Sequence, residues 1–150
     1  MWSSPKRRRF CLYLADAFPR AGLSVPIGDP RRGLLLKWLF FGPSCVEPAI
    51  MDCAYPRKEQ PPRAALGFGE YETVIEVLAK AAAAARPYLM GDQFTAADVV
   101  IGSGLRWGTM FKLLPQRAEF TGYLARLEER PALRRATEKD AELQRMQEAA

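Results

Sequence analysis

Residues 91–101 read Gly-Asp-Gln-Phe-Thr-Ala-Ala-Asp-Val-Val-Ile, and this stretch has the pattern of a helix start. Thr95 is the expected N-cap, and Asp98 follows at the third helical position, where its carboxylate can reach back to the N-cap backbone N–H. Phe94 before the cap and Val99 after it are placed to form a hydrophobic staple across the same turn. The pattern therefore predicts a structural capping box and staple, with Asp in place of the more usual Glu or Gln.

The residues that follow the cap predict a buried helix. Ala96 to Trp107 is apolar on nearly every side, with Asp98 and Arg106 as its only charged residues. A helix without a polar face is stable only inside a protein, where its first N–H groups need partners other than water. We therefore expect an interior helix over these residues, with Gly102 and Gly104 allowing another helix to cross closely.

The rest of the chain also has helical periodicity, and no stretch has the alternation of a strand. Helices are expected from Ser4-Pro5 to about 18, from Asp29-Pro30 to a break at Gly42-Pro43, and at about 45–52, 64–88, 116–129 and 131–147. A linker is expected at 19–29, a loop at 54–63 and a turn at 108–115. The predicted fold class is all-α, a bundle of about five to seven helices around a buried central helix.

The composition fits one globular domain and excludes several kinds of chemistry. The 150 residues include no histidine, which excludes Ser-His-Asp and Cys-His nucleophiles and imidazole metal sites. The three cysteines, Cys11, Cys45 and Cys53, are odd in number and lie in apolar or helical surroundings. They are expected to be buried thiols in a reducing, cytoplasmic compartment, with a reactive thiolate at Cys11 as the alternative.

The net charge is +5, and much of the excess lies in the run Lys6 to Arg9. Such a run can contact nucleic acid or anionic lipid, but no aromatic RNA-binding motif or zinc-finger spacing accompanies it. A solvated end is therefore preferred to a nucleic-acid site. The most apolar run, Leu34 to Phe41, is interrupted by Lys37 and is shorter than the roughly 20 residues that span a bilayer, so no membrane segment is expected.

The capping stretch and its surroundings resemble a known family. The pattern Gly91-x-x-Phe94-Thr95-x-Ala97-Asp98 is similar to the N-capping box and staple of the central buried helix in the C-terminal domain of glutathione S-transferases. The preceding Ala-rich helix and the later segments around Trp107 and 129–136 agree with this pattern. The resemblance covers about residues 10–140 and implies the helical fold of that domain.

The resemblance also implies a division of the chain. Residues 1–18 resemble a remnant of the last helix of a thioredoxin-like domain, 19–29 a linker, and 30–150 the helical domain. In the family, an acidic residue and a Ser open that last helix and bind the γ-glutamyl end of glutathione, whereas Lys6-Arg7 stand there in this chain. We therefore expect a truncated relative without a catalytic residue, inactive alone and binding no cofactor, with glutathione as the family's co-substrate.

The family's hydrophobic substrate site supplies the candidate binding residues. In the family, the electrophile packs against the first long helix of this domain and the region after the buried helix. The matching residues in this chain are Trp38, Phe41, Arg106, Trp107, Met110 and Phe111. Aromatic residues at helical spacing also fit a core, so a structural role is the competing interpretation. The expected partners are a small hydrophobic electrophile and a second copy or a thioredoxin-like domain, and the alternative function is a non-catalytic dimerisation or protein-interaction module.

Overall fold

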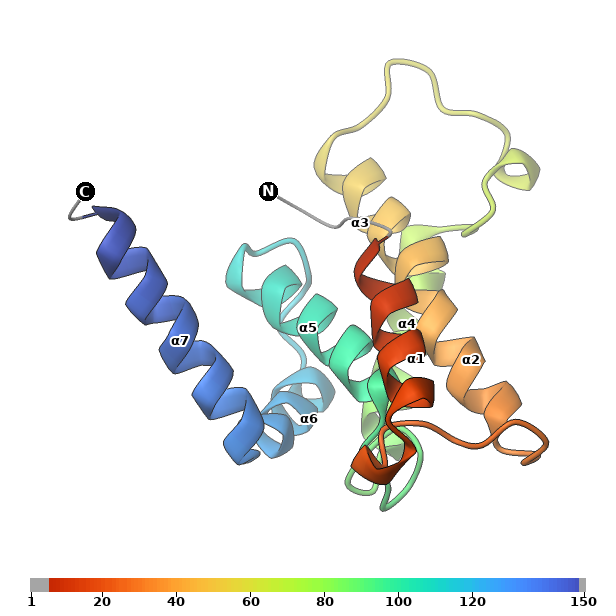
Figure 1. Cartoon of the computed structure of the whole chain (residues 1–150). Coiled ribbons are helices and arrows are strands. Elements are labelled where there is room, and N and C mark those ends of the chain that lie inside the picture. The colour runs from red at the N-terminus through yellow and green to blue at the C-terminus, as the bar shows by residue number, and fades with distance from the viewer. Residues whose placement is uncertain (1–5, 149–150) are drawn as a thin grey trace.

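The computed structural model describes the backbone of residues 6–148 and the side chains of 10–148, and the secondary structure of this part of the chain is mainly helical (Figure 1). Its α-helices are α1 (Lys6–Ala17), α2 (Arg32–Phe41), α3 (Glu47–Ala54), α4 (Tyr71–Ala84), α5 (Ala96–Met110), α6 (Ala118–Glu128) and α7 (Pro131–Glu148). Between residues 6 and 148 there is no strand, only two isolated bridges in the turn before α5. The all-α prediction is confirmed, and the expected helix start at Ser4-Pro5 lies outside the described residues.

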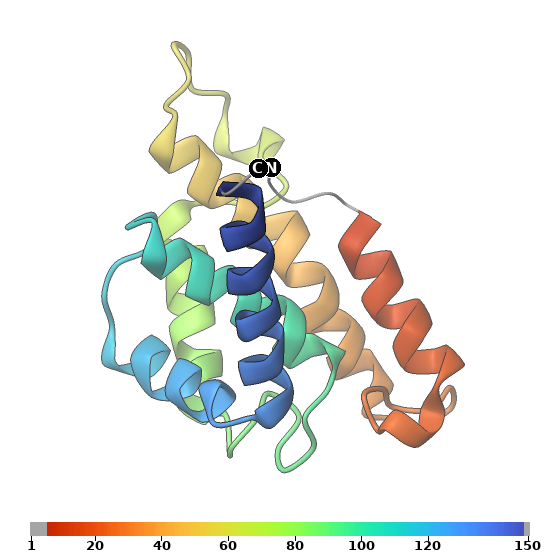
Figure 2. The same cartoon turned by 60° about the vertical axis from the view of Figure 1, so that its left-hand side comes forward.

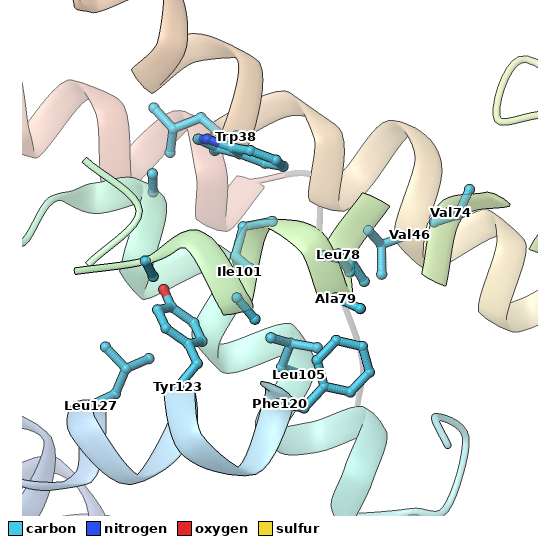
Figure 3. Close-up of a cluster of buried hydrophobic side chains, with 14 of the residues drawn as sticks. Trp38, Val46, Val74, Leu78, Ala79, Ile101, Leu105, Phe120, Tyr123 and Leu127 are labelled. Atoms are coloured by element: carbon cyan, nitrogen blue, oxygen red, sulfur yellow. The ribbon is translucent and has the colours of Figure 1, made fainter. Parts of the chain in front are cut away.

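The core lies where α2 and α6 pack on α5 and α4 packs on α6, and Figure 3 shows side chains from these helices converging. Phe120 and Tyr123 of α6 are fully buried, as are Leu35 of α2, Leu78 of α4 and Leu105 of α5. The central position predicted for the helix after Thr95 is therefore correct.

Two details of the predicted central helix are wrong. The helix continues to Met110, so the expected turn at 108–115 begins later. It is also not buried on all sides, because Val99 is 38% exposed, Met110 is 64% exposed, and Ser103 and Arg106 between them are exposed as well. These four residues share one face of α5. Helix α7 packs on α6; it stands apart from α5 in Figure 1 and passes across α5 in the view of Figure 2.

Two glycines of the central helix have close neighbours, Gly102 at the crossing with α6 and Gly108 beside the turn that follows α5. A Cβ at Gly102 would lie 2.3 Å from Leu127 Cδ1 of α6, and a Cβ at Gly108 would lie 2.5 Å from Leu114 Cδ1. Gly104 has nothing within 4 Å of the same position. The expectation for Gly102 is confirmed, whereas Gly104 does not mediate a crossing.

The long helix predicted over 64–88 is shorter at both ends. Helix α4 begins at Tyr71, because the chain turns through Gly69 with a positive φ of 79°, a conformation that favours glycine. It ends at Ala84, where Ala85 is extended and a cis Arg86–Pro87 peptide follows. The loop after α3 therefore extends to residue 70 and contains only a short helical turn at Arg63–Ala65.

The break predicted at Gly42-Pro43 is a π-helical turn, Gly42–Val46, that joins α2 to α3. Such turns accommodate a proline inside a helix without ending it. The joined segment, Arg32–Ala54, has 23 residues and is long and apolar enough to cross a membrane by length and composition, which corrects the expectation of a run that was too short. The core helix of a soluble protein passes the same test, and Leu35, Leu39 and Ile50 of this segment are core residues.

Helix α1 is attached firmly to the bundle. Ala15 is buried, and Asp16 Oδ2 accepts a 2.7 Å hydrogen bond from Arg32 Nη2 at the start of α2. The hydrogen bonds from Arg32 and Ser24 lower the pKa of Asp16. The segment expected to be a linker also packs on the body, since Val25 is fully buried. The division at 18 and 29 stays a prediction, but these contacts make α1 part of one packed unit.

Candidate functional site

The carboxylate of Asp98 accepts four hydrogen bonds inside the core. Its Oδ2 accepts from the Thr95 N–H at 2.9 Å and from the Thr95 hydroxyl at 3.3 Å. Its Oδ1 accepts from the Leu89 N–H and from the Tyr123 hydroxyl, both at 2.8 Å. Both halves of the predicted capping box are present, and Thr95 and Asp98 are almost completely buried.

The Tyr123 phenol completes this network from α6. Its pKa is strongly raised, first by burial and then by the neighbouring charge of Asp98. The phenol therefore stays protonated and donates to the carboxylate, and it cannot act as a base near neutral pH. Every polar atom of the cluster is used in holding α5, α6 and the preceding turn together, so the cluster is structural.

The proposed staple residues have other surroundings. The Phe94 ring packs edge-on against Tyr88, with ring centroids 5.3 Å apart, and the Arg130 guanidinium lies 3.6 Å from its centroid. Val99 is 38% exposed. Phe94 thus fixes the entry to α5 by a contact with the chain before α7, a partner that local spacing could not identify.

The first candidate aromatic pair lies on α2. Trp38 is 7% exposed and packs edge-on against the half-buried Phe41, with centroids 5.8 Å apart. Lys37 Nζ lies 4.5 Å from the centroid of the Trp38 ring. Trp38 is thus mostly a core residue, and its neighbours Phe41 and Lys37 are more exposed than it is.

The second pair lies at the end of α5 and is more open. The Trp107 and Phe111 rings have centroids 4.5 Å apart at an interplanar angle of 42°. Phe111 is 54% exposed, Met110 beside it is 64% exposed, and Trp107 is half-buried. An apolar surface formed by two rings and a thioether can stack against a flat ligand.

Arg106 is directed to a different side of α5. Consecutive helical residues are about 100° apart around the axis, and Arg106 Nη1 lies 3.4 Å from Thr137 Oγ1 of α7. The six predicted site residues therefore occupy three places, namely the α2 pair, the end of α5, and the gap between α5 and α7. Their role in binding stays a prediction.

Helix α1 presents an apolar stripe to the surface. Phe10, Tyr13 and Leu14 are 59%, 68% and 49% exposed, and their spacing places them along one side of the helix. Phe18, which directly follows the last residue of α1, is 62% exposed. The opposite side of α1 packs on the bundle through Ala15. A stripe of this kind marks a surface that another apolar surface can cover.

The described residues contain no recognisable reaction centre of their own. No group of three or more His, Cys, Asp or Glu side chains among them could hold a metal ion. Contrary to expectation, Cys53 is exposed, while Cys11 and Cys45 are half-buried; burial raises the pKa of the Cys45 thiol. The basic run at Lys6 to Arg9 has no described side chains.

No protein-family model matches the sequence, and no curated protein matches it. Several solved structures do. A glutathione transferase from Methylococcus capsulatus shares 27% identity, with a TM-score of 0.71 over 89% of this chain and 66% of that chain. A sphingomonad glutathione S-transferase complexed with glutathione has 24% identity, a TM-score of 0.67, and coverage of 93% and 68%. A Lodderomyces elongisporus homologue, with two glutathione molecules per subunit, has 19% identity, a TM-score of 0.62, and coverage of 85% and 63%.

These matches confirm the resemblance and the fold. The chain has the helical fold of the C-terminal domain of glutathione transferases, and it spans about two thirds of the length of the transferases it matches. The described residues form one bundle around α5, as that domain's capping pattern predicted.

Proposed function

We propose that this chain, which has the fold of the helical domain of glutathione transferases, holds the hydrophobic electrophile in a glutathione-conjugation system. In this proposal the chain contributes binding and orientation, and glutathione is bound and activated by a thioredoxin-like domain. Conjugation is accelerated when the thiolate and the electrophile are held in contact, so a domain that only positions one reactant still contributes to the rate.

The observation that supports this proposal most directly is the open aromatic surface at the end of α5. The Trp107 and Phe111 ring centroids lie 4.5 Å apart at an interplanar angle of 42°, and Met110, next to Phe111 in the sequence, is 64% exposed. Flat electrophiles with electron-poor rings pack well on such a surface, because offset stacking adds to the gain from burying apolar area. The Trp38–Phe41 pair on α2 is the second candidate wall.

The α1 stripe supports a second part of the proposal. Three large apolar side chains on one face of α1, with Phe18 directly after its end, form an exposed apolar surface suited to an adjoining domain, and Asp16 and Arg32 anchor the helix that carries it. We propose that the thioredoxin-like domain packs there, which would bring its bound glutathione to the helical domain. The three free cysteines fit a reducing, cytoplasmic setting for both parts.

Quenching of tryptophan fluorescence by dinitrobenzene, an unreactive analogue of an aryl electrophile, tests the binding step. We expect saturable quenching and, for Trp107→Ala and Phe111→Ala, a dissociation constant raised at least about fivefold, the loss expected when a stacking partner is removed. Tyr55→Ala is the matched control, because Tyr55 is 74% exposed in the loop after α3. Equal affinity in all four proteins would refute the assignment of this surface.

The alternative function is a non-catalytic helical module for dimerisation or protein contact, and the α1 stripe would serve it equally well. The two functions differ in what small molecules they bind. A module would show no saturable dinitrobenzene binding but would associate through α1, so that replacing Phe10, Leu14 and Phe18 by Ser would abolish association. Binding of dinitrobenzene together with a monomeric state would favour the substrate-holding function.

A further inference from the structure

A hollow of about 400 Å³ lies between α5, the end of α6 and the first three turns of α7. Its lining residues are Arg106, Glu128, Leu133, Arg134, Thr137, Glu138 and Ala141. Its lining includes Arg106 but none of Trp107, Met110 and Phe111, the residues of the aromatic surface proposed for the electrophile. A hollow of this volume is within the range that holds small-molecule ligands.

The hollow exists because α7 is attached mainly at one end. Leu133 in its first turn is half-buried, whereas every residue from 134 to 148 is exposed. Figure 1 shows α7 joined to α6 at one end and standing apart from α5 along its length. Arg106, on the exposed face of α5, therefore lines one side of the hollow, and the face of α7 that carries Thr137 and Ala141 lines the other.

The charges around the hollow are balanced but not paired with one another. Its lining residues include two arginines, Arg106 and Arg134, and two glutamates, Glu128 and Glu138. Between residues 10 and 148, none of the four takes part in an ion pair within 4.0 Å. The donors already in use are the Arg134 Nε, bonded to the Glu128 backbone oxygen at 3.0 Å, and one Arg106 nitrogen, at a long 3.4 Å from Thr137.

Electrostatics and shape together select the class of ligand. An anion alone would be attracted by the arginines but repelled by both carboxylates. A cation alone would be attracted by the carboxylates but repelled by both arginines. A zwitterion satisfies both pairs, because its carboxylate can take the free guanidinium donors while its ammonium approaches the glutamates. Leu133 and Ala141 add an apolar surface for a side chain. We propose that this hollow binds a free amino acid or a short peptide with an apolar side chain as a zwitterion.

The probe for this proposal is the dipeptide leucyl-leucine, followed by chemical shifts of backbone amides in the full 150-residue chain. We expect saturable shifts centred on Arg106, Glu128 and 133–141, with a dissociation constant of about 0.1–1 mM, as suits a ligand of this size. N-acetyl-leucyl-leucine keeps only the negative end, and leucyl-leucine amide keeps only the positive end. Each blocked form should bind at least about fivefold more weakly, because two of the four charges then lose their partner.

Variants test which side chains are responsible. Arg106→Gln and Glu138→Gln should each weaken leucyl-leucine binding at least about fivefold. Arg145→Gln is the matched control, because Arg145 is exposed on the same helix, outside the lining, and bonds only to Ala141 of its own helix. All three residues are exposed, so the variants should fold. No saturable shift, equal binding of the N-acetylated form, or an equal loss in the control would overturn the proposal.

Loss of this site would leave dinitrobenzene binding at Trp107 unchanged, and Trp107→Ala would leave dipeptide binding unchanged. The two proposals can therefore fail separately. The positions of the shifted amides also distinguish the two proposals. The dipeptide should shift amide signals of α7, and dinitrobenzene should shift those of residues 107–111.

Discussion

At the scale of single residues, Asp98 explains how the central helix can begin inside the protein. Its two carboxylate oxygens accept from Thr95, Leu89 and Tyr123, so buried N–H and O–H groups that lack water find a partner in one side chain. The hydrogen bonds between Thr95 and Asp98 follow the capping-box pattern and could be predicted from the sequence. The bonds from Leu89 and Tyr123 could not, because the first depends on the turn before α5 and the second on the packing of α6.

Removing this carboxylate should destabilise the fold more than removing the cap hydroxyl. We expect Thr95→Ala to lower the free energy of unfolding by about 1–2 kcal/mol, and Asp98→Ala by about 3 kcal/mol or more, because the second change leaves several buried donors unsatisfied. Urea denaturation measures both. Asp140→Ala, at an exposed position on α7, is the control and should stay within about 0.5 kcal/mol of the wild type. Equal stability of all three variants would show that the buried network contributes nothing.

The raised pKa of Tyr123 gives a pH-dependent prediction. Because the pKa is higher in the folded than in the unfolded chain, this group stabilises the fold fully below about pH 10, and the contribution falls above that pH by about 1.4 kcal/mol per unit. The wild type should therefore lose more stability than Tyr123→Phe between pH 9 and 11. In a spectroscopic titration, both folded proteins should form the same number of tyrosinates. One additional tyrosinate in the folded wild type would contradict this.

At the scale of elements, the existence and order of the helices could be predicted, whereas several of their ends could not. Apolar periodicity predicts α4 well, but its first turn was placed seven residues early. The chain turns through Gly69 just before the helix begins at Tyr71, and the apolar pattern of the sequence does not show this turn. The exposed face of α5 was missed for a related reason. Val99 and Met110 on this face are apolar, and the helix was therefore predicted to be buried, although Ser103 and Arg106 on the same face are polar.

Glycines in α5 provide a matched pair of substitutions. In Gly108→Ala the new methyl would meet Leu114 Cγ at 2.7 Å, whereas at Gly104 it would meet nothing within 4 Å. We expect Gly108→Ala to cost about 1–3 kcal/mol through overpacking, and Gly104→Ala to stabilise by about 0.5–1 kcal/mol through helix propensity. Thermal denaturation compares the two, and the same sign of change in both would contradict the packing described here.

The attachment of α1 has its own test in two neighbouring arginines. Arg32 bonds to Asp16 and, at 2.6 Å, to the Val25 backbone oxygen, and its side chain is 16% exposed. Arg31 pairs only with Asp29 and is 57% exposed. Arg32→Ala should cost about 1–3 kcal/mol and increase hydrogen exchange across α1, whereas Arg31→Ala should cost less than about 1 kcal/mol. Unchanged exchange in α1 after Arg32→Ala would show that α1 is held by other contacts.

At the scale of the whole molecule, the chain is a helical unit with several open surfaces and no recognisable reaction centre among its described residues. The aromatic end of α5, the stripe on α1 and the charged hollow beside α7 lie on different elements. The fold could be predicted from the capping stretch, because one buried helix start constrains everything packed around it. The six candidate binding residues could be named, but not their division among three places, since that depends on where α2 and α7 lie relative to α5.

The central claim is that this chain holds an electrophile but does not activate glutathione. The rate at which glutathione is conjugated to chlorodinitrobenzene in the presence of the 150-residue chain tests it most directly. We predict that conjugation in the presence of the chain proceeds at the uncatalysed rate measured in buffer alone, at every concentration of the two substrates. This should hold even for a chain that binds dinitrobenzene. A rate that rises with the amount of chain and saturates with both substrates would contradict the account.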